Sequence, residues 1–500
     1  MKLIGKSLDV LFIAPADHKK VFQGLGDEFS AIEPPALAGL FANYLRAKNC
    51  SVAIIDAPAL GLSAEEIADR VASSYNPRLV VMAVYGHQPS ASTQNMPVSG
   101  KICRLIKERD KNIKILMIGT HPSALPERTL KEEAVDFVCK GEGPITISET
   151  LQAIKSGVEN FSKVPGLWYW DGKIIKSNPP APLIQNLDKE FPGIAWDLLP
   201  MEKYRAHNWH CFEDIDHRSP YASLHTSFGC PFNCSFCCIN APFGGPSYRM
   251  FSPDHVIREI DILVNKYGVK NIKFIDELFV LNESHVMGIC DLIIERGYDL
   301  NIWAYTRVDT LQDKFLEKLR KAGIKWLAPG IEAANQKVRD GIRKGIYNEN
   351  IIAAVRKMQS ADINIIANYI FGLPDDTLET MQETLDLAVA INSEWANFYS
   401  AMAYPGSALY TVAEKGGWSL PGNPGGPGWI GYSQHSYECL PLPTKTLTAK
   451  EVLRFRDQAF QTYFSNPVYL EMIQKKFGQK VVNHIKTMAV VPLRRKLLEE

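Results

Sequence analysis

Long apolar runs and an excess of charge are both missing from this 500-residue sequence. No segment of about 18 consecutive apolar residues occurs, so we expect no ordinary transmembrane helix. Lys and Arg together number 55, as do Asp and Glu, and the formal net charge of zero lacks the basic excess that is typical of nucleic-acid-binding proteins. We therefore expect neither a membrane nor a nucleic acid as a partner.

The N-terminus also lacks the features of a secretory signal. Residues 1–11, MKLIGKSLDVL, enter a strand-like run at once and contain neither an apolar signal core nor a cleavage site. A cytoplasmic location is the expectation. In that compartment the ten cysteines are expected to be thiols or metal ligands rather than a disulfide framework.

Three closely spaced cysteines form the most specific motif in the chain. Cys230, Cys234 and Cys237 have C-x3-C-x2-C spacing and follow a strand-like segment at residues 223–228. Thiolates are the usual ligands of iron–sulfur clusters, and full ligation takes four, so three cysteines leave one iron open. Structural zinc, the alternative, usually has four protein ligands, and no second cysteine pair follows. The spacing favours the cluster, although Cys238 leaves a second possible register.

Strands and helices alternate through residues 1–155, which predicts a doubly wound, Rossmann-like parallel α/β sheet. The expected strands lie at 9–14, 51–56, 78–85, 114–119 and 135–139, and the expected helices at 35–46, 64–74, 100–110 and 144–155. Ligands of such sheets bind beyond the carboxyl ends of the strands. Gly, Ser and Thr in the loops there suit a flat or phosphorylated ligand, and an empty scaffold with ordinary Gly turns is the alternative.

A second alternating pattern covers residues 221–412. Its strands are expected at 223–228, 271–276, 301–306, 326–332, 364–371 and 397–402, with helices at 254–266, 284–296, 311–322, 348–361 and 378–392. Six such units predict a partial, TIM-like (β/α)6 barrel. The cysteine loop follows the first strand, at the end of the barrel where chemistry gathers.

Two regions flank the barrel. Residues 156–220 are expected to be a connector with a β-hairpin at 166–176, and its Trp196, Tyr204 and Trp209 to pack between the domains, contact with substrate being the alternative. Residues 413–500 are expected to form a small helical C-terminal region. Its Gly/Pro-rich loop at 416–429 either caps a site or packs against the barrel. The basic cluster at 494–496 is expected to be a solvated helix end.

The cysteine spacing, the preceding Phe236 and the six-strand pattern together resemble the radical S-adenosylmethionine (SAM) superfamily. The resemblance implies that the three cysteines hold a [4Fe-4S] cluster and that SAM chelates the open iron. It implies SAM contacts for Phe236, Arg307, Glu332, Gly372 and Pro374. Asp276 and Glu277 lie where the family places groups that face SAM or substrate. A structural ion pair is the alternative for each of these polar residues.

The first domain resembles the cobalamin-binding domain of cobalamin-dependent radical SAM enzymes. The similarity rests on residues 34–45, 119–126 and 135–143. It implies cobalamin contacts in the loops after the strands, from Ser90, Thr93, Gly119, Thr120, His121, Gly141, Glu142 and Gly143. The Asp-x-His-x-x-Gly motif of other cobalamin proteins is absent, because Asp17 and His18 lack its spacing, and neither His87 nor His121 lies in such a motif. No lower axial ligand is assigned.

Together the two resemblances imply a cobalamin-dependent radical SAM enzyme. In that family a one-electron reductant such as flavodoxin or ferredoxin reduces the cluster. The reduced cluster cleaves SAM, and the resulting radical takes hydrogen from an unactivated carbon. We expect that carbon to receive a methyl group from cobalamin, on a small-molecule biosynthetic intermediate. An oxidative cyclase or ring-rearranging enzyme is one alternative, and a non-catalytic cobalamin- or metal-binding module is another.

Overall fold

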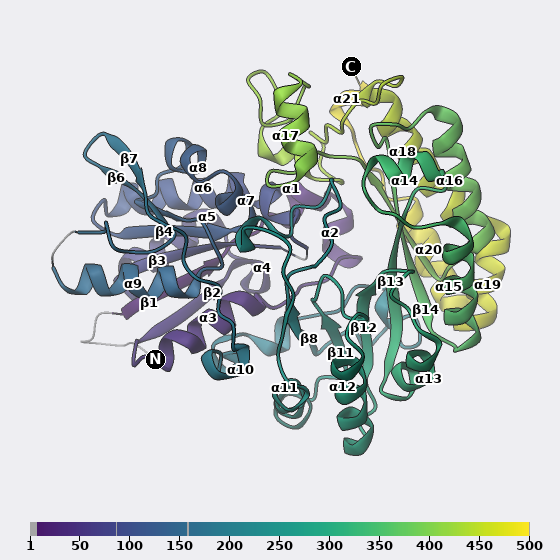
Figure 1. Ribbon diagram of the computed structural model, residues 1–500, viewed down its shortest axis with the longest axis horizontal. Coiled ribbons are helices and arrows are strands. Elements are labelled where there is room, and N and C mark those ends of the chain that lie inside the picture. Colours follow the sequence, from purple (N-terminus) through teal and green to yellow (C-terminus); the bar gives the residue numbers. More distant parts are fainter. Residues whose placement is uncertain (1–7, 87, 158–159, 500) are drawn as a thin grey trace.

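The computed structural model describes residues 8–86, 88–157 and 160–499 and contains two α/β units that lie side by side (Figure 1). The N-terminal unit, purple to blue in Figure 1, is a layered sheet, and the central unit, teal to green, is a partial barrel. The C-terminal helices, yellow, lie beside the last barrel strands. Both parts of the expected α/β fold class are confirmed.

The first sheet has the strand order β2-β1-β3-β4-β5-β6-β7. Its first five strands are parallel: β1 (Leu8–Ala14), β2 (Val52–Asp56), β3 (Pro77–Val84), β4 (Lys114–Gly119) and β5 (Phe137–Cys139). They are almost wholly buried, as continuous apolar runs predict for a parallel sheet covered on both faces. The order reverses between β1 and β3, and that switch point is where open α/β sheets bind ligands.

The hairpin expected in the connector extends this first sheet. It consists of β6 (Leu167–Asp171) and β7 (Ile174–Ser177), and β6 pairs antiparallel with β5, Val138 lying opposite Trp168. Strand β5 is only three residues long. Because β6 pairs along it, the hairpin covers the edge of β5 that would otherwise be open to another chain. The sheet therefore continues to Ser177, beyond the expected boundary at residue 155.

Helices cover both faces of the sheet, and one of them begins earlier than expected. They include α3 (Ala36–Arg46), α5 (Ala64–Arg70), α6 (Ala91–Arg109) and α9 (Pro144–Lys155). Helix α6 begins at Ala91 rather than near residue 100, because its polar first turns and internal Pro97 do not show the apolar period of a helix. Thr93 therefore lies inside a helix instead of in a loop.

The barrel sheet has the order β15-β14-β13-β12-β11-β8, with every neighbouring pair parallel. Its strands are β8 (Tyr221–Leu224), β11 (Asn271–Phe274), β12 (Asn301–Thr306), β13 (Ile324–Glu332), β14 (Asn364–Phe371) and β15 (Trp395–Ser400). The helices between them are α11 (Pro253–Tyr267), α12 (Glu283–Arg296), α13 (Asp313–Lys321), α15 (Asn348–Ser360) and α16 (Leu378–Ile391). Strands β8 and β15 are the two edges, so the barrel is open between them, as six units predict.

Short elements complete the chain. A ribbon of β9 (Ser227–Phe228) and β10 (Arg249–Met250) brackets the cysteine loop. The remaining α-helices are α1 (His18–Phe22), α2 (Leu25–Glu28), α4 (Ala57–Leu60), α7 (Thr120–Ala124), α8 (Pro126–Glu132), α10 (Leu187–Glu190), α14 (Gln336–Gly341), α17 (Ala408–Lys415), α18 (Ala449–Phe464), α19 (Pro467–Phe477), α20 (Gln479–Ala489) and α21 (Lys496–Glu499). Within the described residues, no helix is both long enough and apolar enough to span a membrane.

The connector aromatics pack between the two units. Trp196 donates from Nε1 to the Glu259 carboxylate of α11 over 2.9 Å, and the Tyr204 hydroxyl donates to Asp56 at the end of β2 over 2.7 Å. Trp209 lies edge-on to Trp303 beneath the barrel, with ring centroids 5.2 Å apart. The contacts of Trp196 and Tyr204 agree with the expected packing between the domains, whereas Trp209 packs against barrel residues such as Trp303, Trp326 and Trp395.

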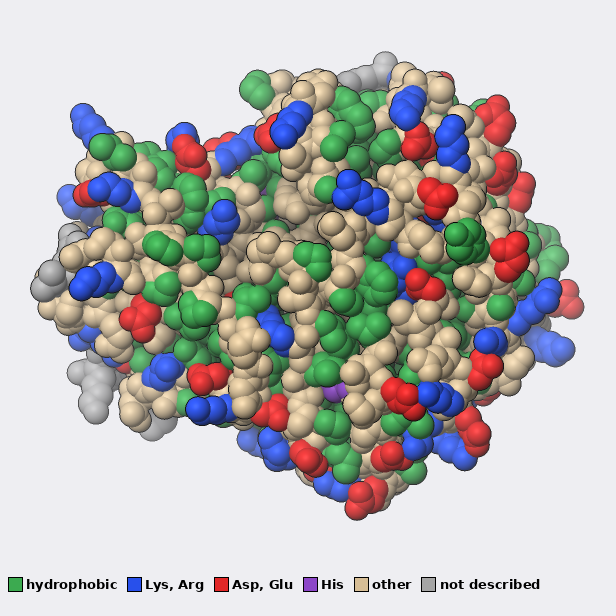
Figure 2. Space-filling model, in the orientation of Figure 1, with side chains coloured by type: hydrophobic (Ala, Val, Ile, Leu, Met, Phe, Trp, Pro, Cys, Tyr) green, Lys and Arg blue, Asp and Glu red, His purple; other side chains and the backbone are tan. Residues whose placement is uncertain are grey.

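The basic cluster near the C-terminus is partly buried, so the expectation of a solvated helix end is wrong for Arg495. Arg495 is 2% exposed, and its guanidinium makes two hydrogen bonds of 3.0 Å to Asp457 of α18. Its Nη1 also donates to the carbonyl of Gln434. On the outer surface, Figure 2 shows Lys and Arg interspersed with Asp and Glu across the visible face, in keeping with the balanced composition.

Candidate active site

The cysteine loop lies at the carboxyl end of β8, with three of its thiols partly exposed. Cys230, Cys234 and Cys237 are the partly exposed cysteines, whereas the other seven are buried. Among the residues described here, no three His, Cys, Asp or Glu side chains converge as they would around a single metal ion. The ligands of one zinc ion would have to converge in that way.

Arg307, at the end of β12, contacts this loop. Its Nη1 donates to Cys234 Sγ over 3.6 Å, and its guanidinium carbon lies 3.9 Å from the centre of the Phe232 ring. Two hydrogen bonds, of 2.9 and 2.8 Å, join it to Asp309, and the carbonyl of Lys344 accepts a third. The guanidinium is thus fixed beside a sulfur that is a candidate cluster ligand.

A cavity opens between the cysteine loop and the carboxyl ends of the barrel strands, and we call it the cluster cavity. It is bounded by the three cysteines together with Phe236, Arg307, Glu332 and Ser90 of the expected site residues. Ser90 therefore lies here rather than among the cobalamin contacts expected for it. The other walls come from aromatic and polar side chains that the sequence did not single out: Tyr305, Lys344, Asn368, Tyr399, Tyr404 and Gln434.

Glu332 is held by a buried ion pair at the end of β13. Lys344 Nζ donates to Glu332 Oε1 over 2.7 Å, and both side chains are less than 8% exposed. The backbone of Glu332 has a φ of +66°, a conformation that is costly for a residue with a side chain and that concentrates at functional sites. Glu332 therefore fits both alternatives: its carboxylate forms the structural ion pair, and it also lines the cavity, as a functional group would.

Gly372 and Pro374 do not line the cluster cavity, whereas the intervening Leu373 does. The N–H of Gly372 and that of Leu373 both donate to the Asp376 carboxylate, over 3.0 and 2.9 Å. Gly372 has a φ of +80°, and a Cβ there would collide with Val452 of α18. These two residues therefore shape the turn after β14 without lining the cluster cavity, and the SAM contacts expected of them stay a prediction.

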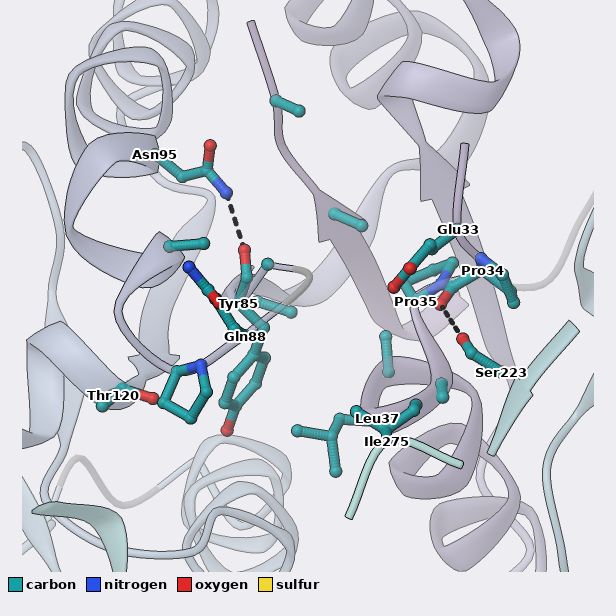
Figure 3. Close-up of a pocket in the computed structure, with 18 of the residues that line it drawn as sticks. Glu33, Pro34, Pro35, Leu37, Tyr85, Gln88, Asn95, Thr120, Ser223 and Ile275 are labelled. Carbon is teal, nitrogen blue, oxygen red and sulfur yellow. Dashed lines mark hydrogen bonds between the residues drawn. The ribbon is translucent and has the colours of Figure 1, made fainter. Parts of the chain in front are cut away.

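A second cavity lies between the first sheet and the barrel, and we call it the interdomain cavity (Figure 3). The carboxyl ends of all five parallel strands reach it, through Ala14, Asp56, Tyr85, Thr120 and Glu142. Figure 3 shows Tyr85, Gln88 and Thr120 on one side and Glu33, Pro34 and Pro35 on the other, with Ser223 and Ile275 contributed by the barrel. This is the position that the switch point of the sheet predicts.

The walls of the interdomain cavity fit a large, mainly apolar ligand with polar edges. Pro34, Leu37, Tyr85 and Ile275 provide flat or aliphatic surface. His225, also in the wall, has a buried Nδ1 without a hydrogen-bond partner in the described part of the chain. Buried polar atoms are normally paired, so this atom favours a ligand with hydrogen-bonding groups, as the amide-edged corrin of cobalamin has.

Five of the expected cobalamin residues line neither cavity: Thr93, Gly119, His121, Gly141 and Gly143. Gly119 instead allows close strand packing, because a Cβ there would collide with the carbonyl oxygen of Val84. Thr120 and Glu142 do line the interdomain cavity. The Glu142 carboxylate, however, binds Arg249 over 2.8 Å and the N–H of Ile184 over 3.1 Å, which joins the first sheet to the barrel.

His121 is enclosed by the Gly/Pro-rich loop. Its ring lies edge-on to Trp429 at a centroid distance of 4.4 Å, and its Nδ1 is hydrogen-bonded to Thr93 over 3.2 Å. Burial lowers the pKa of His121 to about 3. Trp429 Nε1 also donates to Glu132, so the end of the 416–429 loop packs on the first domain. His87 lies outside the described residues.

Several residues of the site carried no signal in the sequence. Glu33 reaches from the first domain to the buried Lys273 of β11 over 3.2 Å, and it lines the interdomain cavity. Gln434, from the C-terminal region, accepts from the N–H of Ser400 and donates to its carbonyl, which holds it in the wall of the cluster cavity. Only folding brings such distant segments together, so no local motif could have identified them.

Comparison with known proteins identifies the two units separately. The model of the radical SAM superfamily matches residues 224–388, and that of the B12 binding domain matches residues 24–151. An uncharacterized methyltransferase of Pyrococcus horikoshii is 31% identical over 409 residues, which cover 82% of this chain and 83% of that protein. The anaerobic magnesium-protoporphyrin IX monomethyl ester cyclase of Rubrivivax gelatinosus is 29% identical over 409 residues, covering 80% and 69%.

A solved structure shares the arrangement of both units. It is the cobalamin-dependent SAM radical enzyme OxsB with aqua-cobalamin and SAM bound, which superposes with a TM-score of 0.71. The match covers 96% of this chain and 71% of that one, at 16% sequence identity. At this identity the likeness concerns the fold, and it includes the placement of the sheet unit against the barrel.

Proposed function

Because this chain belongs to the radical SAM enzymes that carry an N-terminal cobalamin-binding domain, we propose that it methylates a carbon atom of a small-molecule substrate. Its cofactors are a [4Fe-4S] cluster, SAM and cobalamin. The observation that carries the proposal is the junction of the two cavities. Gln88, Pro89, Ile239 and Glu277 line both of them, so ligands in the two cavities meet across these four side chains.

Residues of the cluster cavity have distinct roles in this proposal. Cys230, Cys234 and Cys237 hold the cluster, and Arg307 donates to the sulfur of Cys234. Phe236 and the Glu332–Lys344 pair line the space beside the cysteine loop, and there they orient SAM. When bound, the cluster supplies the electron that cleaves SAM, and cobalamin carries the methyl group.

Residues of the interdomain cavity hold the second cofactor. Tyr85 and Thr120 on the first sheet, with Pro34 and Leu37 before and within α3, provide the surface against which the corrin packs. His225 offers its unpaired Nδ1 to a polar edge group. Closure of the barrel by the first domain keeps water away from the junction, where a substrate radical would otherwise be lost to side reactions.

The proposed reaction requires partners outside the chain. One substrate C–H bond becomes C–CH3, and each turnover consumes two SAM molecules and two electrons and releases methionine, 5′-deoxyadenosine and S-adenosylhomocysteine. A one-electron donor such as flavodoxin or ferredoxin supplies the electrons. The apolar and aromatic walls of the cluster cavity favour a small organic molecule as the substrate.

The test is product analysis with the reconstituted, anaerobic holoenzyme, a reductant, SAM and a metabolite extract. The expected result is 5′-deoxyadenosine and S-adenosylhomocysteine together with a product that is heavier by one methylene unit. A product that loses two hydrogens or gains oxygen without an added methyl group would identify a cyclase or rearranging enzyme, the alternative that the cyclase of Rubrivivax gelatinosus supports. Formation of 5′-deoxyadenosine without methylated product or S-adenosylhomocysteine would contradict methyl transfer.

A further inference from the structure

Arg249 connects the cysteine loop to the first domain without lining either cavity. It belongs to β10, and its backbone pairs with Phe228 of β9, which lies two residues before Cys230. Its side chain is 8% exposed. A residue so placed touches no ligand in the cavities, so any effect on the cofactors must pass through the residues that it holds.

The guanidinium of Arg249 closes a ring of hydrogen bonds among three segments. Its Nη2 donates to Glu142 Oε1 over 2.8 Å, and its Nη1 donates to the carbonyl of Ile184 over 2.6 Å. The N–H of Ile184 in turn donates to the other oxygen of Glu142 over 3.1 Å. The first domain, the connector and the ribbon of β9 and β10 are thus joined at one point. Because the ion pair is buried, loss of either partner would leave a charge without compensation.

Two aromatic rings in the wall of the interdomain cavity contact the guanidinium. Its carbon lies 5.9 Å from the centre of the Phe228 ring and 5.4 Å from that of Phe243, within the range of a cation–π contact. Both rings line the interdomain cavity, as Glu142 does. A ligand in that cavity therefore packs against the same side chains that hold Arg249 in place.

The backbone of the ribbon links this point to the cysteine loop. The N–H of Ser247, two residues before Arg249, donates to the carbonyl of Cys230 over 3.2 Å. Gly229 has a φ of +83°, and a Cβ there would collide with the carbonyl oxygen of Ser247, so the two segments are in close contact. A displacement of Arg249 would therefore be passed to the first of the three expected cluster ligands.

We propose that Arg249 is a positioning residue that couples the two cofactor sites, so that cobalamin and the cluster each bind more tightly when the other is present. The coupling is positive because either cofactor orders side chains that the other would otherwise have to order. It is also reciprocal, as any coupling between two binding equilibria must be. The inference rests on the cofactors alone, and it can hold whether or not the enzyme transfers a methyl group.

The experiment measures the affinity for hydroxocobalamin by equilibrium dialysis, with the cluster reconstituted and again after a chelator has removed the iron. In the wild-type protein we expect the cluster to strengthen cobalamin binding by about 5-fold or more, a typical size for coupling between sites. In Glu142→Gln/Arg249→Met this ratio should fall to about one. The double variant removes both charges together, so neither is left buried alone.

Glu259→Gln is the matched control. The Glu259 carboxylate also accepts from a backbone N–H, that of Ile194, and from one side chain, Trp196, but it lines neither cofactor cavity. This variant should keep the wild-type ratio. Circular dichroism and iron analysis show whether each protein is folded and loaded.

Three outcomes overturn the proposal. Equal cobalamin affinity with and without the cluster in the wild-type protein does so without any variant. So does a wild-type ratio in the loaded double variant, or an equal loss of that ratio in Glu259→Gln. A folded double variant that loses its iron supports the link, since neither changed residue is an expected cluster ligand, provided that Glu259→Gln retains its iron. Equal loss of iron from both variants overturns it.

Discussion

Arg307 donates a hydrogen bond to the sulfur of Cys234, with 3.6 Å between Nη1 and Sγ. The two residues are 73 positions apart, and the contact exists because β12 ends opposite the cysteine loop. The same guanidinium is held by Asp309 and lies over the Phe232 ring, so it has little freedom to leave. A fixed cationic donor beside a cluster ligand raises the reduction potential, because it stabilises the more negative reduced cluster.

Replacing Arg307 by Lys should weaken this effect without removing the cluster. Lysine keeps the charge but cannot make the two-pronged contact with Asp309. We expect the iron content to persist, the potential to fall, and 5′-deoxyadenosine formation to drop about 10-fold or more, as for other residues that support metal ligands. An EPR-monitored redox titration measures the potential. Arg320→Lys, in the surface pair with Asp362, is the matched control, and an unchanged potential in Arg307→Lys would contradict the role.

Cys237→Ala and Cys238→Ala should separate the two possible registers of the cysteine motif. Both Cys237 and Cys238 line the cluster cavity, but Cys237 is partly exposed whereas Cys238 is 4% exposed. We expect Cys238→Ala to retain about four iron atoms per chain after reconstitution and Cys237→Ala to lose most of the cluster. Iron and sulfide analysis with the visible spectrum checks this. The opposite pattern would assign the third ligand to Cys238.

The Glu332–Lys344 pair allows structural and functional roles to be distinguished. Lys344→Met leaves a buried carboxylate alone and should lower the free energy of unfolding by about 3–5 kcal/mol. The double variant Glu332→Gln/Lys344→Met should recover most of that loss, yet bind SAM more weakly. Urea unfolding and equilibrium dialysis with SAM measure the two quantities. Wild-type SAM affinity in the double variant would leave Glu332 with a structural role alone.

His121 should make the protein less stable in mild acid. Its folded-state pKa is lowered from 6.5 to about 3, so below pH 6.5 the unfolded chain binds a proton that the folded chain does not. The resulting penalty grows as the pH falls and reaches about 2 kcal/mol at pH 5. In His121→Gln, the loss of unfolding free energy between pH 7 and pH 5 should be smaller by that amount. Parallel stability curves for variant and wild type would contradict the burial of this ring.

The sequence determined the elements whose signals are local. Continuous apolar runs predicted the parallel strands of both sheets, because a strand buried on both faces must be apolar throughout. The C-x3-C-x2-C spacing indicated the cluster, because all of its protein ligands lie on one short loop. The predicted start of helix α6, near residue 100, was too late. Its first turns are polar and contain Pro97, so they lack the apolar period that indicates a helix.

The cofactor residues show where local signals end. Loop glycines such as Gly119 and Gly372 stood out in the sequence, but their missing side chains serve close packing against Val84 and Val452. His121 is of a ligand type, yet Trp429, from the distant C-terminal region, encloses it. A residue type and its neighbours in the chain do not state which surface the side chain will face.

Tertiary structure alone decided how the two units form one site. Glu33 pairs with Lys273 across 240 positions, and Glu142 with Arg249 across 107, and neither pair has a local pattern. The sequence motif placed Glu277 among the groups that could face SAM or substrate, but only the fold shows that it lines both cavities. The physical reason is that charge pairing and cavity shape depend on contacts between distant segments, which exist only after the apolar strands and helices have packed.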